Sequence, residues 1–219
     1  MPLMQKRGVI SLFWLHKLAT NAPSCLLVCH AMAPVRGNDG VGRTCPHCRN
    51  KTAIHTFLSP LPYHHPIVSL LIHELKYRRI RALGPVCAER IVSYLAYYRA
   101  ILPPRAIIIA IPLHPRKERV RGFNQALLIA SEVSKRLQIP VESRCLIRTT
   151  WHAPQSALSA SLRRKNVEHI FQVPNPRSIR SKTILLFDDI KTTGATLEEA
   201  ARVLKKAGAK AIWAITFAH

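Results

Sequence analysis

A chain of 219 residues with 48% apolar residues is long enough for one α/β core and a small additional segment, and is too apolar for a disordered protein. Its 33 Lys and Arg residues against 11 Asp and Glu residues give a formal net charge of +22, which is extreme for a small-molecule enzyme. Such a charge indicates anionic partners, namely nucleic acid, polyphosphates or a membrane surface, with a merely solvated basic face as the alternative.

The chain begins with a short apolar segment. The run Gly8–Leu15 follows two basic residues, and His16 and Lys17 interrupt it. A membrane span needs about 20 apolar residues, and no stretch of the chain approaches that length. A signal peptide with a cleavage site near Ala19–Ala22 is one interpretation, but the apolar run is short for it. We instead expect an amphipathic helix over Val9–Leu18 and a cytoplasmic protein.

Four cysteines form two pairs that are separated by fifteen residues: Cys25, Cys29, Cys45 and Cys48. This spacing predicts a tetrahedral Zn²⁺ site that is closed and therefore structural. The metal would stabilise a segment that is too short for a core of its own. Disulfides or free thiols are the alternatives, and His30 or His47 could replace one thiolate because the first pair is wider than usual. We therefore predict a metal-binding segment over residues 1–59 and a second domain over residues 60–219.

Helix and strand patterns alternate after residue 60. Apolar residues at helical spacing predict helices over Ile67–Tyr77, Pro85–Ala100 and Asn124–Leu137. Continuous apolar runs predict buried strands over Ala106–Ile111 and Lys210–Phe217. The pattern favours an α/β fold with a mostly parallel sheet.

Many basic residues gather in three clusters: Lys76, Arg78, Arg79 and Arg81; then Arg116, Lys117, Arg119 and Arg121; then Arg163, Arg164 and Lys165. The second cluster follows a buried strand, so we expect a basic loop at the carboxyl edge of the sheet, where ligands bind. At that edge Arg119 and Arg121 could bind an anionic ligand such as a pyrophosphate group, with a solvated loop as the alternative. Aromatic residues are not interleaved with the clusters, so the sequence does not predict a base-stacking surface.

The stretch from residue 183 to residue 207 carries the clearest functional pattern. An apolar strand, Thr183–Phe187, runs into Asp188 and Asp189, and the whole chain has only three aspartates. A short loop then leads into a helical pattern over Ala195–Ala207. Adjacent carboxylates repel each other and lose hydration when they are partly buried, so such a pair usually needs a ligand, a metal or donor hydroxyls.

The loop after the carboxylates consists of Lys191, Thr192, Thr193, Gly194, Ala195 and Thr196. Free N–H groups at the start of a helix suit a phosphate, and threonine hydroxyls add donors. The carboxylates could accept hydrogen bonds from vicinal sugar hydroxyls. The sequence therefore predicts a phosphosugar site, with an ordinary capped strand, loop and helix as the alternative.

This stretch resembles the signature of the type I phosphoribosyltransferases. The resemblance implies that Asp188 and Asp189 hold the ribose hydroxyls of phosphoribosyl pyrophosphate (PRPP) and that the loop Lys191–Thr196 binds its 5′-phosphate. Lys191 departs from the signature, which usually has an apolar residue at that position. The lysine could point into solvent or add charge beside the phosphate.

Further motifs resemble the ComF/GntX family of phosphoribosyltransferase-like proteins, and together with the cysteine pairs they cover the chain from about Cys25 to Phe217. They are Leu75-Lys76-Tyr77, Pro112-Leu113, Arg119, Arg121-Gly122-Phe123-Asn124-Gln125, Gln155 with Leu158-Ser159, and Arg164 with Asn166-Val167. The resemblance implies a type I phosphoribosyltransferase fold with helices around the sheet and a zinc-ribbon-like amino-terminal segment. It also implies a role in natural competence or DNA utilisation, with competence or DNA-processing proteins as partners.

Two functions follow from the sequence. The first is a PRPP-dependent transferase with an unknown acceptor, in which Mg²⁺ is held mainly by the ligand and water. Arg163, Arg164 and Asn166, in a segment over residues 143–175 that resembles a mobile insertion, would then contact the substrate as parts of a lid. The second is a protein that binds single-stranded nucleic acid, or an adaptor, and keeps the fold as a phosphate-binding scaffold.

Overall fold

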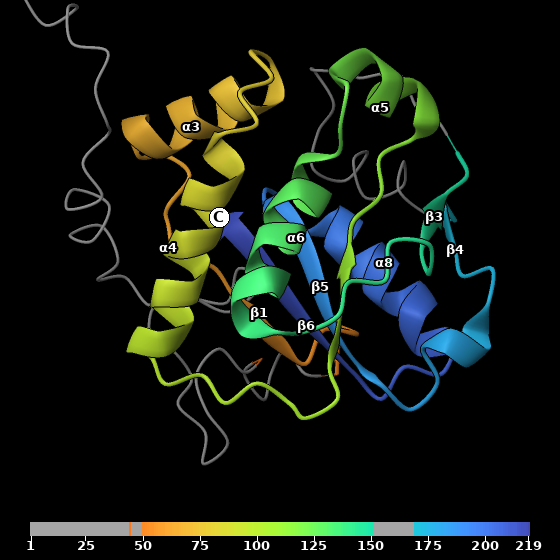
Figure 1. Ribbon diagram of the computed structural model, residues 1–219. Helices are drawn as coiled ribbons and strands as arrows, with labels where there is room; N and C mark the ends of the chain where they lie inside the picture. Colours follow the sequence, from red (N-terminus) through yellow and green to blue (C-terminus); the bar gives the residue numbers. More distant parts are fainter. Residues whose placement is uncertain (1–43, 45–49, 151–168) are drawn as a thin grey trace, which may run out of the picture.

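The computed structural model of the chain describes Thr44, residues 50–150 and residues 169–219; the two cysteine pairs and the third basic cluster lie outside them. Four parallel strands form the central sheet in the order β1-β6-β5-β2 (Figure 1). They are β1 (Thr56–Leu58), β2 (Ile107–Ala110), β5 (Thr183–Ile190) and β6 (Ala211–Ala218). All four carboxyl ends therefore lie at one edge of the sheet.

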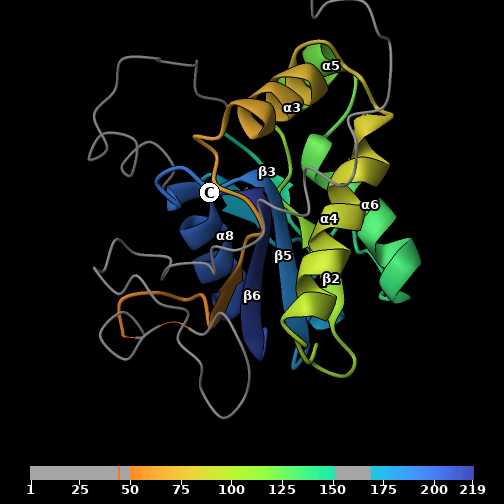
Figure 2. The ribbon, with the colours of Figure 1, turned by 90° about the vertical axis from the view of Figure 1, so that its left-hand side faces the viewer.

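Helices cover both faces of this sheet. The α-helices of the described residues are α3 (Pro66–Lys76), α4 (Leu83–Tyr97), α5 (Pro115–Arg121), α6 (Gln125–Leu137) and α8 (Ala195–Lys206), of which α5 lies above the carboxyl edge. The helices α4 and α6 pack on one face and α8 packs on the other (Figure 2). Alternate residues of β5 enter the two cores: Leu185 and Phe187 face α4 and α6, whereas Ile184 and Leu186 face α8. The sheet is thus buried on both faces, as the continuous apolar strands predicted.

A small antiparallel sheet lies beside the core that α8 covers. It pairs β3 (Ile147–Arg148) with β4 (Phe171–Gln172), and the short helix η2 (Pro176–Ser178) follows. Leu146 and Phe171 are buried in the same cluster as Leu197 of α8. This contact holds β3 against the main body next to the carboxyl edge.

Most predicted elements are confirmed to within a few residues, and the carboxylates differ in one respect. We expected the strand to stop at Phe187, but β5 continues through both aspartates to Ile190. The reason is that β6 continues beside it, with Asp188 opposite Thr216 and Ile190 opposite Ala218. The carboxylates therefore belong to a strand and not to a loop.

The prediction of a basic loop over residues 116–121 is wrong, because these residues form α5. Pro115 occupies the start of the helix, and the His114 side chain accepts a hydrogen bond of 3.2 Å from the N–H of Arg116. Gly122 ends the helix with φ 83°, a left-handed conformation that favours glycine. A helix distributes its side chains around an axis, so these basic residues do not all face the same way.

The sheet also begins earlier than the domain boundary that the sequence predicted at residue 60. Thr56 pairs with Trp213 of β6, so β1 is part of the main sheet. The N–H of Ala53 donates a hydrogen bond of 2.7 Å to Glu198 of α8. Thr44 donates to the carbonyl of Ile54 at 2.7 Å. In the described part of the chain, no helix has the length and apolar character that a bilayer crossing requires.

Candidate functional site

The two aspartates lie next to each other at the carboxyl end of β5. Asp189 is buried, whereas Asp188 is half-buried. The N–H of Asp189 donates a hydrogen bond of 2.8 Å to Oδ1 of Asp188. The two carboxyl groups therefore act on each other at one strand end.

Asp189 forms an ion pair with a lysine that the sequence analysis did not connect with it. Nζ of Lys76, the last residue of α3, lies 2.9 Å from Oδ2 of Asp189, and the two side chains are only 16% and 10% exposed. Burial raises the pKa of the nearby Cys87 thiol, and the charge of Asp189 raises it further. The family motif Leu75-Lys76-Tyr77 contains this lysine, but nothing in the motif places it beside Asp189.

Asp188 has a different environment. Burial raises the pKa of its carboxyl to about 7, the charge of Asp189 raises it as well, and Lys76 opposes the rise. Arg148 of β3, which is half-buried, interacts electrostatically with Asp188. Burial lowers the pKa of Arg148, and the negative charge of Asp188 opposes that change. Arg148 was missed because a two-residue strand carries no periodic pattern.

The predicted phosphate loop leads directly into α8. Thr192 and Thr193 are exposed, and Oγ1 of Thr193 accepts a hydrogen bond of 3.4 Å from the N–H of Ala195, the first residue of the helix. Gly194 precedes the helix with φ 78°. Thr196, the last residue of the predicted loop, lies in the first turn. The first N–H groups of a helix have no acceptor within it, so this turn is suited to an anion.

Lys191, the residue that departs from the family signature, points toward β1. Its Nζ lies 5.3 Å from the ring centroid of Phe57, and its backbone N–H donates a hydrogen bond of 2.9 Å to Ala218. The side chain is half-buried and passes close to Gly194, where an added Cβ would lie 3.4 Å from Cε of the lysine. The lysine thus packs beneath the loop and contacts an aromatic ring.

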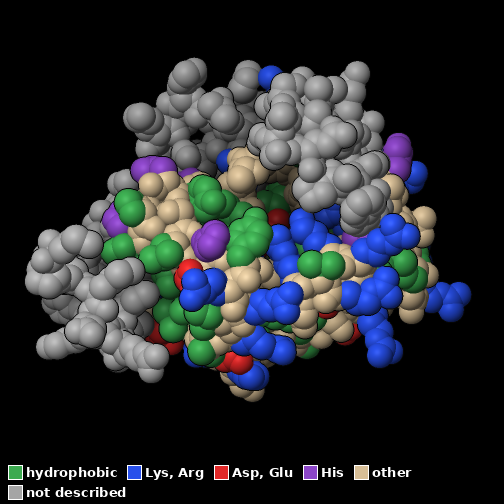
Figure 3. Space-filling model, turned by 90° about the horizontal axis from the view of Figure 1, so that it is seen from above, with side chains coloured by type: hydrophobic (Ala, Val, Ile, Leu, Met, Phe, Trp, Pro, Cys, Tyr) green, Lys and Arg blue, Asp and Glu red, His purple; other side chains and the backbone are tan. Residues whose placement is uncertain are grey.

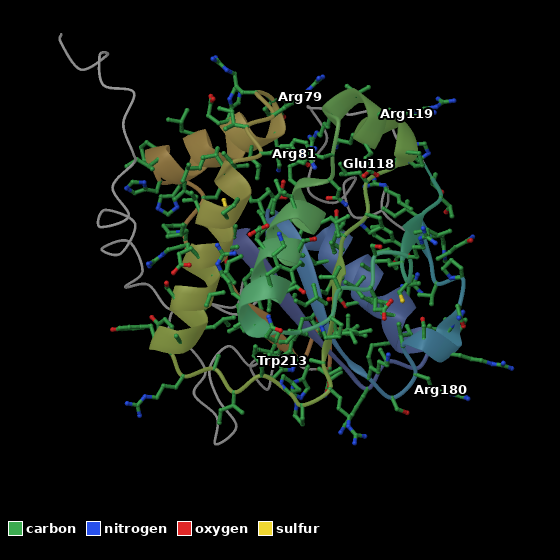
Figure 4. The ribbon with its side chains drawn as sticks, in the orientation of Figure 1. Arg79, Arg81, Glu118, Arg119, Arg180 and Trp213 are labelled. Atoms are coloured by element: carbon green, nitrogen blue, oxygen red, sulfur yellow. The ribbon has the colours of Figure 1, made fainter. Side chains whose placement is uncertain are left out.

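The helix α5 turns some of its cations toward the carboxyl edge and others away from it. Lys117 is half-buried; burial lowers its pKa, the cations of Arg121, Arg148 and Lys76 lower it further, and Asp189 opposes them. Arg119 is exposed and lies on the outer side of α5 (Figure 4). Residues 117 and 121 share one side of a helix, whereas residue 119 does not. Besides Lys76, Lys117 of α5 interacts electrostatically with Asp189 and Arg148 of β3 with Asp188, whereas Arg119 points away from the site.

His114 lies at the start of α5 among these cations. Desolvation lowers its pKa, and the charges of Arg116, Arg148 and Arg119 add to that effect. Its Nδ1 accepts the hydrogen bond from the N–H of Arg116, which requires an unprotonated nitrogen. The imidazole is consequently neutral and adds no charge to the site at pH 7.

The segment 77–81 meets α5 above the carboxyl edge, and we call these two segments the basic arch. Nη2 of Arg79 donates a hydrogen bond of 2.6 Å to the carbonyl of Val120, and the guanidinium of Arg81 lies 5.1 Å from the ring centroid of Phe123. The Arg121 guanidinium lies 5.8 Å from the ring centroid of Tyr77. These three contacts tie the first and second basic clusters together.

The basic arch contains an aromatic ring that the sequence analysis did not expect. Tyr77 is 65% exposed, and its ring lies 4.8 Å from that of His73. From above, Figure 3 shows a hollow with acidic atoms at its floor and Lys and Arg side chains along one rim. The structure thus brings two carboxylates, a helix N-terminus, several cations and an exposed tyrosine to one edge of the sheet.

Comparisons with known proteins place this arrangement in a family. The model of the "Phosphoribosyl transferase domain" matches residues 124–219, which include β5, the loop and α8. The "DNA utilization protein YhgH" of Escherichia coli O157:H7 is 32% identical over 172 residues, which cover 77% of this chain and 74% of that protein. The chain belongs to the ComF family of phosphoribosyltransferase-like proteins. Because of this match, the resemblance seen in the sequence and the type I phosphoribosyltransferase fold are both confirmed.

Two further relatives of the ComF family cover less of the chain. "Competence protein F" of Haemophilus influenzae is 33% identical over 151 residues, which cover 66% of this chain and 65% of that protein. "Competence protein ComFC" of Bacillus subtilis is 36% identical over 102 residues, which cover 47% of this chain and 39% of that protein. The family is thus shared by proteins whose names refer to competence and to DNA utilisation.

Proposed function

We propose that the carboxyl edge of this ComF-family protein binds a phosphoribosyl ligand, with PRPP as the ligand that fits best. The observation that carries the proposal is the sequence of groups along β5 and α8: two carboxylates, a Thr/Gly loop and a helix N-terminus. Carboxylates accept hydrogen bonds from sugar hydroxyls, and the free N–H groups at the helix start donate hydrogen bonds to a phosphate. These groups lie inside the matched phosphoribosyl transferase domain.

The ligand would lie along the edge with its charges matched group by group. Its 5′-phosphate would bind at Thr192–Thr196, and its ribose hydroxyls would approach Asp188 and Asp189. Its pyrophosphate would face Lys117 and Arg148, which flank the carboxylates. Mg²⁺ would neutralise the remaining phosphate charge, held mainly by ligand oxygens and water. Arg121 stays a candidate at the rim, whereas Arg163 and Arg164 lie outside the described residues.

The chemistry that we propose for such a site is phosphoribosyl transfer. The bond between C1 of the ribose and pyrophosphate breaks, the pyrophosphate leaves with the bonding electrons, and a nitrogen acceptor forms the new bond to C1. Lys117 and Arg148 would stabilise the leaving group because they carry positive charge where negative charge develops. The proposal does not specify which nitrogen compound is the acceptor.

Titration calorimetry of the purified protein with PRPP tests the proposal, with and without Mg²⁺. We expect saturable binding that strengthens when Mg²⁺ is present, because the metal reduces the repulsion between the phosphates and the two carboxylates. Ribose without phosphate serves as the control and should not bind measurably. Absence of PRPP binding under both conditions would remove the proposed function.

We further infer a role in natural competence or DNA utilisation, which the names of the relatives support. A second candidate function, binding of single-stranded nucleic acid, is favoured by the basic arch. Its cations meet backbone phosphates, and the exposed ring of Tyr77 offers a face on which a base can stack. The fold alone does not choose between the two functions, and one protein can have both.

Replacing Arg78 and Arg119 by Gln tests this second function. Both side chains are exposed on the arch. Each phosphate contact that is lost should make the slope of the logarithm of the single-strand binding constant against the logarithm of the salt concentration shallower by about 0.7. Fluorescence anisotropy with a labelled oligonucleotide at several salt concentrations measures that slope. The matched control replaces Arg177 and Arg180, which are both exposed and precede the amino end of β5; Figure 4 shows Arg180 at the edge opposite the arch. An equal loss in both variants would point to net charge alone and would contradict an interface at the arch.

The Zn²⁺ site stays a proposal that depends on the cysteines outside the described residues. Within the described ranges, no three metal-ligating side chains come together. We expect about one zinc per chain by elemental analysis, with loss of the metal in Cys45→Ser. Cys145→Ser is the control, because that thiol is buried in the main domain and should leave the zinc content unchanged. A full zinc content in Cys45→Ser would contradict the four-cysteine site.

A further inference from the structure

The ion pair between Lys76 and Asp189 connects α3 with the end of β5. Its two side chains are nearly buried, and their charged atoms are 2.9 Å apart. A buried carboxylate that loses such a partner is left with an uncompensated charge and tends to take up a proton. Here a second carboxylate lies next to it in the chain, so the effect of losing the lysine would extend to both groups.

The charged groups around Asp188 come from several elements. Asp189 lies beside it on β5, Lys76 reaches the pair from α3, and Arg148 faces it from β3. On β6 its neighbour in register is Thr216, which carries no charge. Among these groups, Lys76 lowers the pKa of Asp188 and Asp189 raises it. One lysine thus contacts one carboxylate directly and acts electrostatically on the other.

We propose that Lys76 is a positioning residue that serves both carboxylates: its ion pair fixes Asp189, and its charge favours the ionised form of the adjacent Asp188. An ionised carboxylate accepts hydrogen bonds from sugar hydroxyls on both oxygens and binds them more strongly than a protonated carboxyl group, in which one oxygen has become a donor. The lysine therefore prepares the acidic pair for a ligand without taking the place of any part of that ligand. The consequence for ligand binding rests on the proposed function, whereas the effect of Lys76 on the charge of Asp188 does not.

The position of Lys76 also links the acidic pair to the basic arch. Tyr77 is the next residue, and its ring contacts Arg121 of α5. The segment is held again by the hydrogen bond from Arg79 to Val120. These contacts fix the end of α3 relative to α5, which gives the lysine a defined position from which to reach β5.

A titration without any ligand tests the proposal. The chain has three aspartates, so ¹³C-labelled aspartate gives three side-chain carboxyl signals, and Asp188→Asn identifies the one that matters. In Lys76→Met we expect the pKa of Asp188 to rise by about one unit or more. Lys76→Gln should shift it in the same direction, and Lys76→Arg should restore it in part because a cation is retained.

Lys135→Met is the matched control, because Lys135 also forms an ion pair, at 2.6 Å with Glu132, but lies on the surface of α6. It should leave all three aspartate signals unchanged. An unchanged Asp188 titration in folded Lys76→Met and Lys76→Gln would overturn the proposal, as would an equal shift in Lys135→Met.

Ribose 5-phosphate then separates positioning from direct contact with pyrophosphate, because it carries none. We expect Lys76→Met to weaken its binding at pH 7 about tenfold, with recovery at higher pH as Asp188 ionises. A loss that affects PRPP but spares ribose 5-phosphate would assign Lys76 to the pyrophosphate and overturn the positioning role. Failure of the wild type to bind either ligand would remove the proposed function and leave the titration result standing.

Discussion

Replacing Asp188 or Asp189 by Asn is expected to weaken PRPP binding about 30-fold in each case, measured by calorimetry with Mg²⁺ present. The substitution removes the negative charge and leaves only one oxygen acceptor, and a charge-assisted hydrogen bond contributes about 2 kcal/mol. The two sites are neighbours on one strand, so their effects should not simply add. We expect the double variant to show no measurable binding.

The two single variants should differ in their dependence on pH. The pKa of Asp188 is raised to about 7, so its ionised form becomes dominant only above neutral pH. Ligand binding that requires the ionised form should strengthen from pH 6 to pH 8. Asp188→Asn should lose this component of the pH dependence, whereas Asp189→Asn should keep a titrating group at position 188. PRPP binding that is unchanged in both variants would mean that the acidic pair is not part of the ligand site.

Folding of these variants needs a separate measurement because Asp189 is paired with Lys76. Asp189→Asn leaves the buried lysine without its counter-ion, and breaking a buried ion pair from one side is destabilising. Asp188 has no ion pair of that kind within the described part of the chain, so Asp188→Asn is the cleaner test of ligand binding. Urea unfolding of both variants distinguishes lost affinity from lost structure.

The part of the site that the sequence predicted is the part that is local in the chain. Asp188, Asp189 and the loop up to Thr196 form one continuous stretch, so a strand followed by a helix was sufficient to place them together. The motifs of the ComF/GntX family predicted the fold for the same reason, because each motif is a short run of residues. Nothing in this stretch required knowledge of which distant elements pack against it.

The rest of the site depends on tertiary structure. Lys76 and Arg148 reach the carboxylates from α3 and β3, and the distance along the chain gives no hint of either approach. The position of both carboxylates within β5 follows from the continuation of that strand, which is set by its pairing with β6. A sequence can show that two carboxylates are adjacent, but the partner strand decides whether they belong to a strand or to the loop after it.

The sequence analysis placed the second basic cluster at the carboxyl edge of the sheet, which is correct, but it predicted a loop where the structure has a helix. A loop gives no reason to prefer one of its cations over another, and the sequence analysis assigned Arg119 and Arg121 to the pyrophosphate. As the helix α5, it has an inner side with Lys117 and an outer side with Arg119. The proline and the histidine that start the helix were visible in the sequence, and the capping role of His114 was the signal that could have corrected the prediction.

This geometry leads to the second large expected effect. Arg148→Met and Lys117→Met should each weaken PRPP binding by about 2 kcal/mol, or about 30-fold, because each removes a cation beside the proposed pyrophosphate position. Calorimetry with PRPP and with ribose 5-phosphate measures the effect on both ligands. Ribose 5-phosphate lacks the pyrophosphate, so its affinity should change by less than about threefold.

Arg119→Met is the matched control, since it removes the same charge from the outer side of α5 and should change PRPP affinity by less than about threefold. The comparison also decides between two accounts of the +22 charge. If the basic residues act only through their combined field, removing any one of them has the same small effect. If the fold selects particular cations for the ligand, the two inward residues matter and Arg119 does not. A loss in Arg119→Met equal to that in Arg148→Met would contradict the assignment of the pyrophosphate to the inner side of the helix.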